Sequence, residues 1–246
     1  MSASPAQPKA ELLGDTVVVI GGSAGIGLET ARRARAKGAN LILTGRNPER
    51  LQQAASELGA RSHAFDATDT AALERFFREV PAIDHVMVTA GRPYYARLAD
   101  MDFAEVRRVI DEHVMLALQV ARSSAGKVRP GGSLLFMTGT GGHPAVGGVI
   151  ASAMAAALPA LVANLALELA PIRVNLIAAG FVDTSLSASL LGGDLEGRRN
   201  HLRATLPIRR VVEPADVAAL AVHTMTNTAL TGATYDVDGG QQLLAG

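Results

Sequence analysis

A glycine-rich turn lies directly after an apolar run near the start of the chain, and this pairing limits the possible folds more than any other feature. The run is Thr16-Val17-Val18-Val19-Ile20, and the turn is Gly21-Gly22-Ser23-Ala24-Gly25-Ile26-Gly27. Continuous β-branched residues are typical of a strand that is buried on both faces. Glycines let a backbone approach a pyrophosphate closely, and a helix that begins there offers free N–H groups. Strand, turn and helix in this order predict a dinucleotide site, and a simple tight turn is the alternative.

Apolar runs and helical segments alternate along the whole chain. Further strands are expected at 41–44, 62–65, 83–88, 133–137, 173–177 and 234–237, and helices at 25–37, 48–58, 70–80, 103–124, 148–170 and 214–225. Repeated strand–helix–strand units imply a parallel sheet with helices on both faces. Because no internal repeat or linker divides the sequence, we expect residues 1–246 to form a single Rossmann-type, doubly wound α/β domain.

Composition excludes several classes of function. The chain has 23 basic and 23 acidic residues, which argues against electrostatic binding to nucleic acid or to an anionic membrane. It has no cysteine, so thiol catalysis and cysteine metal sites are excluded, and a reducing cytoplasm is the expected location. The histidines lack metal-ligand spacing, so we expect no metal. Residues 1–13 lack the basic start and apolar stretch of a signal peptide, and we expect them to form a loose arm.

Two later segments depart from the regular pattern. Residues 145–167 carry no charge and are long enough to span a bilayer, but they are rich in alanine and contain Pro159 and Asn164. We therefore expect a helix that is buried in the core or between subunits. Residues 185–207 are polar and contain Gly192-Gly193, which indicates a mobile insertion on the substrate side of the domain.

The residue after the second expected strand discriminates between nicotinamide cofactors. An acidic residue there would bind the ribose 2′-hydroxyl and repel a 2′-phosphate, but this chain has Gly45-Arg46. Arg46 can hold a phosphate in a forked geometry, which favours NADP(H), and a plain surface arginine is the alternative. Asp66, just after the third strand, either accepts a hydrogen bond from the adenine amine or caps a helix.

These motifs resemble the short-chain dehydrogenase/reductase family over nearly the whole chain. The resemblance rests on the 21–27 turn, Asp66, Ala90-Gly91, Arg173-Val174-Asn175, and the stretches 179–184 and 231–240. It implies a seven-stranded parallel sheet and a small-molecule substrate. It also implies a homo-oligomer, a tetramer or a dimer, with contacts from the uncharged helix and the last strand. Further cofactor contacts are implied at Ala90, Gly91, Gly180, Val182 and Thr184.

The family's acid–base residues are missing from their expected positions. The family uses a serine after the fifth strand, a Tyr-x-x-x-Lys on the next helix and an asparagine on the helix before. The resemblance places Gly139 at the serine, Ala151 and Ala155 at the tyrosine and lysine, and His113 at the asparagine. A slip of one residue gives no better match. No realignment restores the dyad, because that spacing does not occur among the tyrosines and lysines of the chain: Tyr94, Tyr95, Tyr235, Lys9, Lys37 and Lys127.

Other side chains are candidates to replace the missing groups. Tyr95, like Tyr94, follows Gly91 at the carboxyl end of the fourth strand, where it either donates a proton or packs against substrate. His143 lies in the glycine-rich loop after the fifth strand and either acts as acid or base or is simply solvated. Thr138, with Thr140 nearby, can donate a hydrogen bond to a carbonyl group.

Two further groups near these candidates have a structural and a functional interpretation. His113 can replace a structural asparagine by bonding a backbone carbonyl at a helix kink. Arg92 and Arg97 flank the tyrosines, and either bind an acidic substrate or lie solvated at the surface.

Two hypotheses of function follow from this combination. The first is an NADP(H)-dependent oxidoreductase with a non-standard site, which reduces a carbonyl, a quinone or an activated alkene. The second is a catalytically silent NADP(H)-bound sensor, regulator or partner subunit. The small residues at the dyad positions should leave an apolar hollow beside the nicotinamide that can hold a ligand.

Overall fold

A seven-stranded sheet with every neighbouring pair parallel forms the centre of the molecule, in the order β3-β2-β1-β4-β5-β6-β7. The computed structural model describes residues 11–141 and 145–244. The order reverses between β1 and β4, which makes their carboxyl ends the switch point where ligands bind in such sheets. The predicted doubly wound α/β fold is confirmed. The strands are β1 (Thr16–Ile20), β2 (Asn40–Gly45), β3 (Arg61–Ala64), β4 (Ile83–Val88), β5 (Val128–Gly139), β6 (Arg173–Ala179) and β7 (Thr234–Val237).

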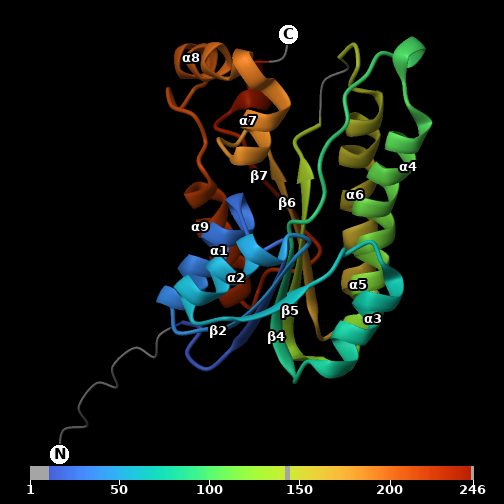
Figure 1. Ribbon diagram of the computed structural model, residues 1–246, viewed down its shortest axis with the longest axis vertical. Helices are drawn as coiled ribbons and strands as arrows, with labels where there is room; N and C mark the ends of the chain where they lie inside the picture. Colours follow the sequence, from blue (N-terminus) through green and yellow to red (C-terminus); the bar gives the residue numbers. More distant parts are fainter. Residues whose placement is uncertain (1–10, 142–144, 245–246) are drawn as a thin grey trace, which may run out of the picture.

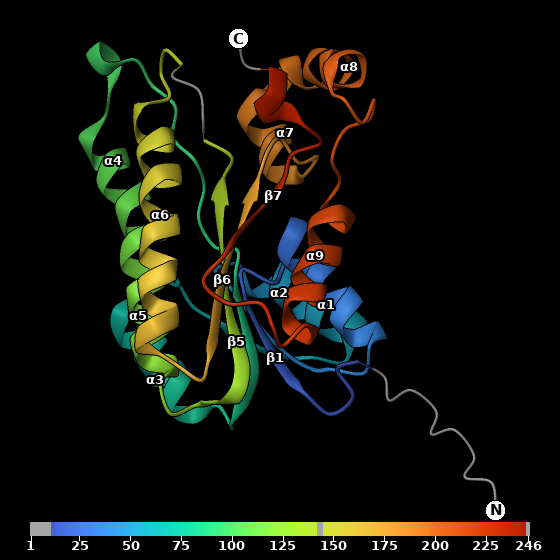
Figure 2. The same ribbon diagram turned by 180° about the vertical axis from the view of Figure 1, so that it is seen from behind.

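Helices cover both faces of the sheet. Helices α1, α2 and α9 pack on one face, and α3, α4, α5 and α6 pack on the other (Figures 1 and 2). A single π-helical turn, Asp111–Met115, joins α4 to α5. The helices are α1 (Gly25–Ala36), α2 (Pro48–Leu58), α3 (Thr70–Glu79), α4 (Phe103–Ile110), α5 (Leu116–Ser124), α6 (Val149–Glu168), α7 (Ser185–Leu191), α8 (Leu195–Thr205) and α9 (Pro214–Thr226).

The central strand β1 is apolar throughout because both of its faces are buried. Val18 and Ile20 join the core cluster under α3, α5 and α6, whereas Val17 and Val19 join the cluster under α1, α2 and α9. All four are fully buried. Full burial of such a side chain stabilises the fold by about 1.5–3 kcal/mol, so both faces of β1 anchor the turn that follows it.

Local signals set the helix ends. Asn47 caps α2 by accepting from the Arg50 N–H (2.8 Å), Pro48 begins the helix, and Gly59 ends it in a left-handed conformation with φ of 59°. Helix α9 begins with a capping box in which the side chains of Glu213 and Asp216 each accept from the other residue's backbone N–H. These ends agree with the predicted ones.

Residues 1–13 were expected to form a loose arm, but Leu12 near its end is packed against the domain. Leu12 is 1% exposed, and its N–H donates to the Lys37 carbonyl (3.1 Å). The end of the arm therefore packs against the domain. Residues 1–10 lie outside the described part.

Helix α6 is the uncharged helix that the sequence predicted. It is the one helix among the described residues that is long and apolar enough to cross a membrane, and only 17% of its most apolar window is buried. Leu158, Val162 and Leu165 face the core, whereas Val149 is 53% and Leu167 is 79% exposed. Burial in the core of its own chain is therefore wrong for most of α6, and burial between subunits stays a prediction.

Residues 185–207 contain two helices where a loose insertion was expected. Helices α7 and α8 are joined at Gly192, whose φ of +53° is left-handed, and they lie at the carboxyl end of the sheet (Figure 1). They lie above β6 and β7, and a role on the substrate side stays a prediction.

Candidate cofactor and active site

The turn after β1 packs so tightly that two of its glycines cannot be replaced. A Cβ atom on Gly21 would lie 2.8 Å from the Ala90 nitrogen, and one on Gly27 would lie 2.4 Å from the Gly21 carbonyl oxygen. Both distances are shorter than a carbon atom can tolerate, so only glycine allows this packing. The turn, the start of α1 and the end of β4 thus form one unit, which brings Gly21, Gly27 and Ala90 together as predicted.

The first turn of α1 offers uncompensated N–H groups. Ala24 precedes the helix without a side-chain cap, and the first turn has no acidic residue. Four N–H groups at a helix start lack partners inside the helix, and the dipole is positive there, so this end suits a phosphate. Ser23 is buried in the same turn, and Ile26 lies half-buried in the first helical turn.

The segment after β6 lies opposite this turn. Thr184 caps α7 by accepting from the Ser187 N–H (3.2 Å), and a Cβ atom on Gly25 would lie 3.5 Å from its methyl group. Val182 is buried and pairs in parallel with Val212. The structure therefore brings the predicted cofactor residues of β1, β4 and β6 to a common crevice at the switch point.

Gly180 has close neighbours of its own at the end of β6. A Cβ atom on Gly180 would lie 2.7 Å from the Asp238 Cβ, and the next N–H, of Phe181, donates to the Gln241 side chain (3.0 Å). This packing fixes the backbone where β6 enters the crevice.

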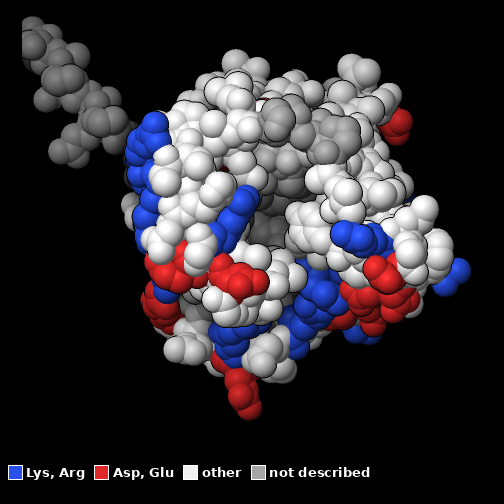
Figure 3. Space-filling model, turned by 90° about the horizontal axis from the view of Figure 1, so that it is seen from above, with Lys and Arg blue, Asp and Glu red and all other residues white. Residues whose placement is uncertain are grey.

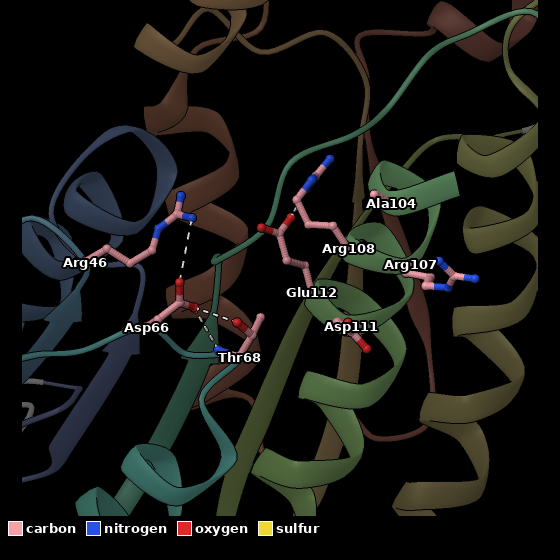
Figure 4. Close-up of a pocket in the computed structure, with 8 residues that line it drawn as sticks. All are labelled: Arg46, Asp66, Thr68, Ala104, Arg107, Arg108, Asp111 and Glu112. Atoms are coloured by element: carbon pink, nitrogen blue, oxygen red, sulfur yellow. Dashed lines mark hydrogen bonds and ion pairs between the residues drawn. The ribbon is translucent and has the colours of Figure 1, made fainter. Parts of the chain in front are cut away.

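A cavity of about 360 Å³ lies at one end of this crevice, between the ends of β2 and β3 and helix α4 (Figure 4). Arg46 Nη1 lies 4.0 Å from Asp66 Oδ2, and both side chains are largely exposed. Asp66 also accepts from the Thr68 N–H (3.0 Å) and hydroxyl (2.8 Å). The cavity is lined by Arg46, Asp66, Thr68, Ala104, Arg107, Arg108, Asp111 and Glu112.

Asp66 carries a negative charge that its surroundings favour. Partial burial raises the pKa of its carboxyl, but the two hydrogen bonds from Thr68 and the charge of Arg46 outweigh burial, so the net pKa is lowered. Helix α3 is capped by Asp69, which accepts from the Ala72 N–H (3.0 Å). The helix-cap interpretation of Asp66 is therefore wrong, and its carboxylate remains on the cavity wall.

Helix α4 contributes a charged network to the crevice that the sequence analysis missed. Glu112 is 7% exposed, pairs with Arg108 and accepts from the Arg92 N–H (3.0 Å). The Arg92 guanidinium pairs in turn with Glu105 (2.9 Å). The charge of Arg92 is thus balanced, which argues against the predicted binding of an acidic substrate. The i,i+4 spacing of Arg108 and Glu112 was the signal that could have revealed this network.

The network holds the chain just after Gly91 against α4. Gly91 has a left-handed φ of +124°, and a Cβ there would lie 3.2 Å from the His113 ring. His113 belongs to the π-helical turn, and its Nδ1 lies 2.9 Å from the carbonyl oxygen of Val109 in α4. This agrees with the structural role expected for His113, and it leaves the ring packed on Gly91.

The candidate proton donors differ in their surroundings. Tyr95 is 65% exposed; partial burial raises the pKa of its phenol, and Arg198 opposes that shift. Because most of the Tyr95 side chain is exposed, solvent limits the rise in the pKa of its phenol. The Tyr94 hydroxyl accepts from the Asp102 N–H (2.8 Å) and so serves the start of α4. Thr138 is buried at the next-to-last position of β5, and His143 lies outside the described residues.

Comparison with known proteins identifies the family. A family model described as enoyl-(acyl carrier protein) reductase matches residues 21–242. The chain belongs to the short-chain dehydrogenase/reductase family. It is 30% identical to the oxidoreductase UcpA of Salmonella typhimurium over 254 residues, which cover 95% of this chain and 96% of that protein.

Two further similar proteins are described by the ligands that they bind. The cyclic-di-GMP-binding biofilm dispersal mediator protein of Escherichia coli K12 is 27% identical over 233 residues, which cover 92% of this chain and 96% of that one. A crystal structure of a small-chain dehydrogenase in complex with NADPH is 26% identical with a TM-score of 0.81, over 94% of this chain and 99% of that one.

Ala151 and Ala155, which the resemblance predicted at the dyad positions, lie in the first two turns of α6. A Cβ on Gly141 would lie 2.2 Å from the Ala155 Cβ. The backbone of Gly141 therefore packs closely against Ala155, whose side chain is half-buried, and the expected apolar hollow stays a prediction.

The described lysines lie far from these positions. Lys37 pairs with Glu11 (3.2 Å) at the end of α1, and Lys127 donates to the carbonyls of Arg78 and Val80 before β5. Both are at the amino end of the sheet, and Lys9 is outside the described part. Within that part, no cluster of histidine and acidic side chains could hold a metal ion.

Proposed function

We propose that the protein binds NADP(H) in the crevice between the turn after β1 and the segment after β6. The observation that carries this proposal is the approach of Thr184 to Gly25, because it places two predicted cofactor segments opposite each other beside the uncapped start of α1. A related structure in complex with NADPH supports it. In this proposal the N–H groups of α1 bind the pyrophosphate.

The cavity in Figure 4 would hold the adenosine end of the cofactor. Arg46 would bind the 2′-phosphate with its forked guanidinium, and the ionised Asp66 would accept from the adenine amine. Ala90 and Gly91 would form the floor between the two halves of the site. Gly180, Val182 and Thr184 would line the nicotinamide end.

We further propose an oxidoreductase with a non-standard active site, which reduces a carbonyl, a quinone or an activated alkene. NADPH, when bound, supplies the hydride. The chain's own part is to position the substrate and to provide a proton, for which Tyr95, His143 and Thr138 are the candidates. General acid–base help is worth ~10²–10⁴-fold, so replacing the family's dyad would slow reduction without preventing it.

A catalytically silent NADP(H)-bound sensor or partner subunit is the second candidate function. The sequence supports it, because Ala151 and Ala155 stand where the family resemblance expects the tyrosine and the lysine. A relative that is named for binding cyclic-di-GMP supports the idea that ligand binding can be the task of such a chain.

The cofactor proposal predicts a selective defect in Arg46→Ala. Loss of one charge-assisted phosphate contact at an exposed position should weaken NADPH about tenfold and leave NADH nearly unchanged. Fluorescence titration measures both dissociation constants. Arg61→Ala, at the start of β3 on the opposite end of the sheet, is the matched control. Equal NADPH affinity in wild type and Arg46→Ala would contradict the assignment.

A turnover screen separates the two candidate functions. NADPH oxidation is followed with ketones, quinones and enones as acceptors, in wild type, Tyr95→Phe and His143→Ala. Substrate-dependent turnover that falls ~10²-fold or more in one variant, while NADPH affinity is retained, supports the oxidoreductase and identifies the proton donor. Tight NADPH binding without turnover for any acceptor supports the silent sensor.

A further inference from the structure

Helix α8 carries three arginines, of which two are paired with carboxylates and one is not. Arg199 is held by Asp183 in a two-bonded pair (2.7 and 2.8 Å), and Arg203 is held by Glu196 (2.9 Å). Arg198 has no carboxylate partner among the residues that the structure describes, although it is half-buried. A guanidinium that is partly withdrawn from water without a counter-charge is a potential binding site for an anion.

The surroundings of Arg198 place it at the crevice. Its guanidinium carbon lies 5.9 Å from the centre of the Phe181 ring, within the range of a cation–π contact. Its charge also acts on the phenol of Tyr95. Phe181 follows β6 and Tyr95 follows β4, so both lie at the carboxyl edge of the sheet, next to Gly180 and Gly91.

The neighbouring charges do not neutralise Arg198. Asp183 is already paired with Arg199, and Glu196 is already paired with Arg199 and Arg203. Tyr95 does not supply a negative charge near neutral pH, because the pKa of its phenol is raised above the ordinary value of about 10. Seen from the carboxyl end, the molecule has a hollow with basic side chains at its rim (Figure 3).

We propose that Arg198 binds a carboxylate group of the substrate, while Phe181 and Tyr95 contact the apolar part of the same molecule. The proposal rests on the proposed function, because it assigns the substrate class of that site: a carbonyl compound that carries a carboxylate. A guanidinium holds a carboxylate through two parallel hydrogen bonds. One guanidinium balances one negative charge, which fits a carboxylate better than a phosphate dianion.

The test compares two probes, 4-carboxybenzaldehyde and methyl 4-formylbenzoate, in which a carboxylate is replaced by its neutral methyl ester. Binding is measured by calorimetry with the full chain, with and without NADP⁺, so that no turnover is needed. Wild type should bind the acid about tenfold tighter than the ester, as expected for one charge-assisted contact. Arg198→Gln should remove this preference, Arg198→Lys should keep part of it, and Arg203→Gln should keep all of it.

The outcomes for the two proposals are distinct. If NADP⁺ fails to bind, the cofactor proposal is wrong, and the acid–ester comparison without NADP⁺ still decides the role of Arg198. Equal affinity for both probes in wild type overturns the carboxylate proposal, as does a preference that survives in Arg198→Gln or an acid that does not bind at all. Unchanged NADP⁺ affinity in Arg198→Gln shows that the variant is folded.

Discussion

His85 in β4 is a buried base at the amino end of the sheet, away from the crevice. It is 5% exposed; its Nδ1 lies 2.9 Å from the Ser133 hydroxyl and its Nε2 lies 3.6 Å from Asp15. Burial lowers the pKa of the imidazole, with a further decrease from Arg173, and these effects outweigh the opposite influence of Asp15 and Asp84. The folded protein therefore keeps this ring neutral at a pH where the unfolded chain protonates it.

This shift predicts an acid-sensitive contribution to stability. The pKa of His85 is lower in the folded state than in the unfolded chain, where it is about 6.5. The contribution of His85 to the free energy of unfolding is therefore complete above about pH 6.5 and is lost as the pH falls below that value. The free energy of unfolding, measured with urea between pH 7.5 and 5.5, should fall more steeply in wild type than in His85→Asn. The difference should reach at most about 1.4 kcal/mol per pH unit, the limit for one proton.

A control and a contradicting result are available for this prediction. His201 is exposed on α8, so His201→Asn serves as the matched replacement of a surface histidine. Parallel stability curves for wild type and His85→Asn would show that burial of His85 does not act on stability in this way.

Single residues also show how far the sequence could predict the site. The glycine turn and the pair Arg46 and Asp66 were predictable, because their chemistry depends on positions next to strands. Asp66 and Asp69 are three residues apart, and only the structure shows which one caps α3. That Arg198 has no carboxylate partner among the described residues was not predictable, because it depends on which arginines of α8 face Asp183 and Glu196.

At the scale of elements, the sequence predicted where helices and strands form better than it predicted what each of them packs against. The lack of charge in α6 predicted a helix, but a lack of charge does not tell which neighbour covers the helix. Gly192-Gly193 indicated a mobile insertion, whereas these residues belong to a short 3₁₀ helix between α7 and α8. The ion pairs of Glu196 with Arg199 and Arg203 support α8, and their spacing of three and seven residues was visible in the sequence.

At the scale of the whole molecule, apolar side chains of α5, α6 and the π-helical turn are exposed in the part of the chain that the structure describes. Besides Val149 and Leu167 on α6, Met115 and Leu118 are each 42% exposed on the neighbouring helical turns. An exposed apolar surface of this kind is typical of a protein–protein interface. Together with the family membership, it predicts that a second copy of the chain covers this face.

This interface predicts a change of mass in solution on a single substitution. Wild type should be a dimer or tetramer by light scattering, because a stable interface needs more than about 1,000 Å² of buried surface and these helices are long enough to supply it. Leu167→Glu and Leu118→Glu should each shift the population toward monomers, since a carboxylate is costly to bury. Leu13→Glu, at a leucine that is 52% exposed near the end of α1, should leave the mass unchanged. A monomeric wild type, or oligomers that withstand both substitutions, would mean that α6 is not buried between subunits.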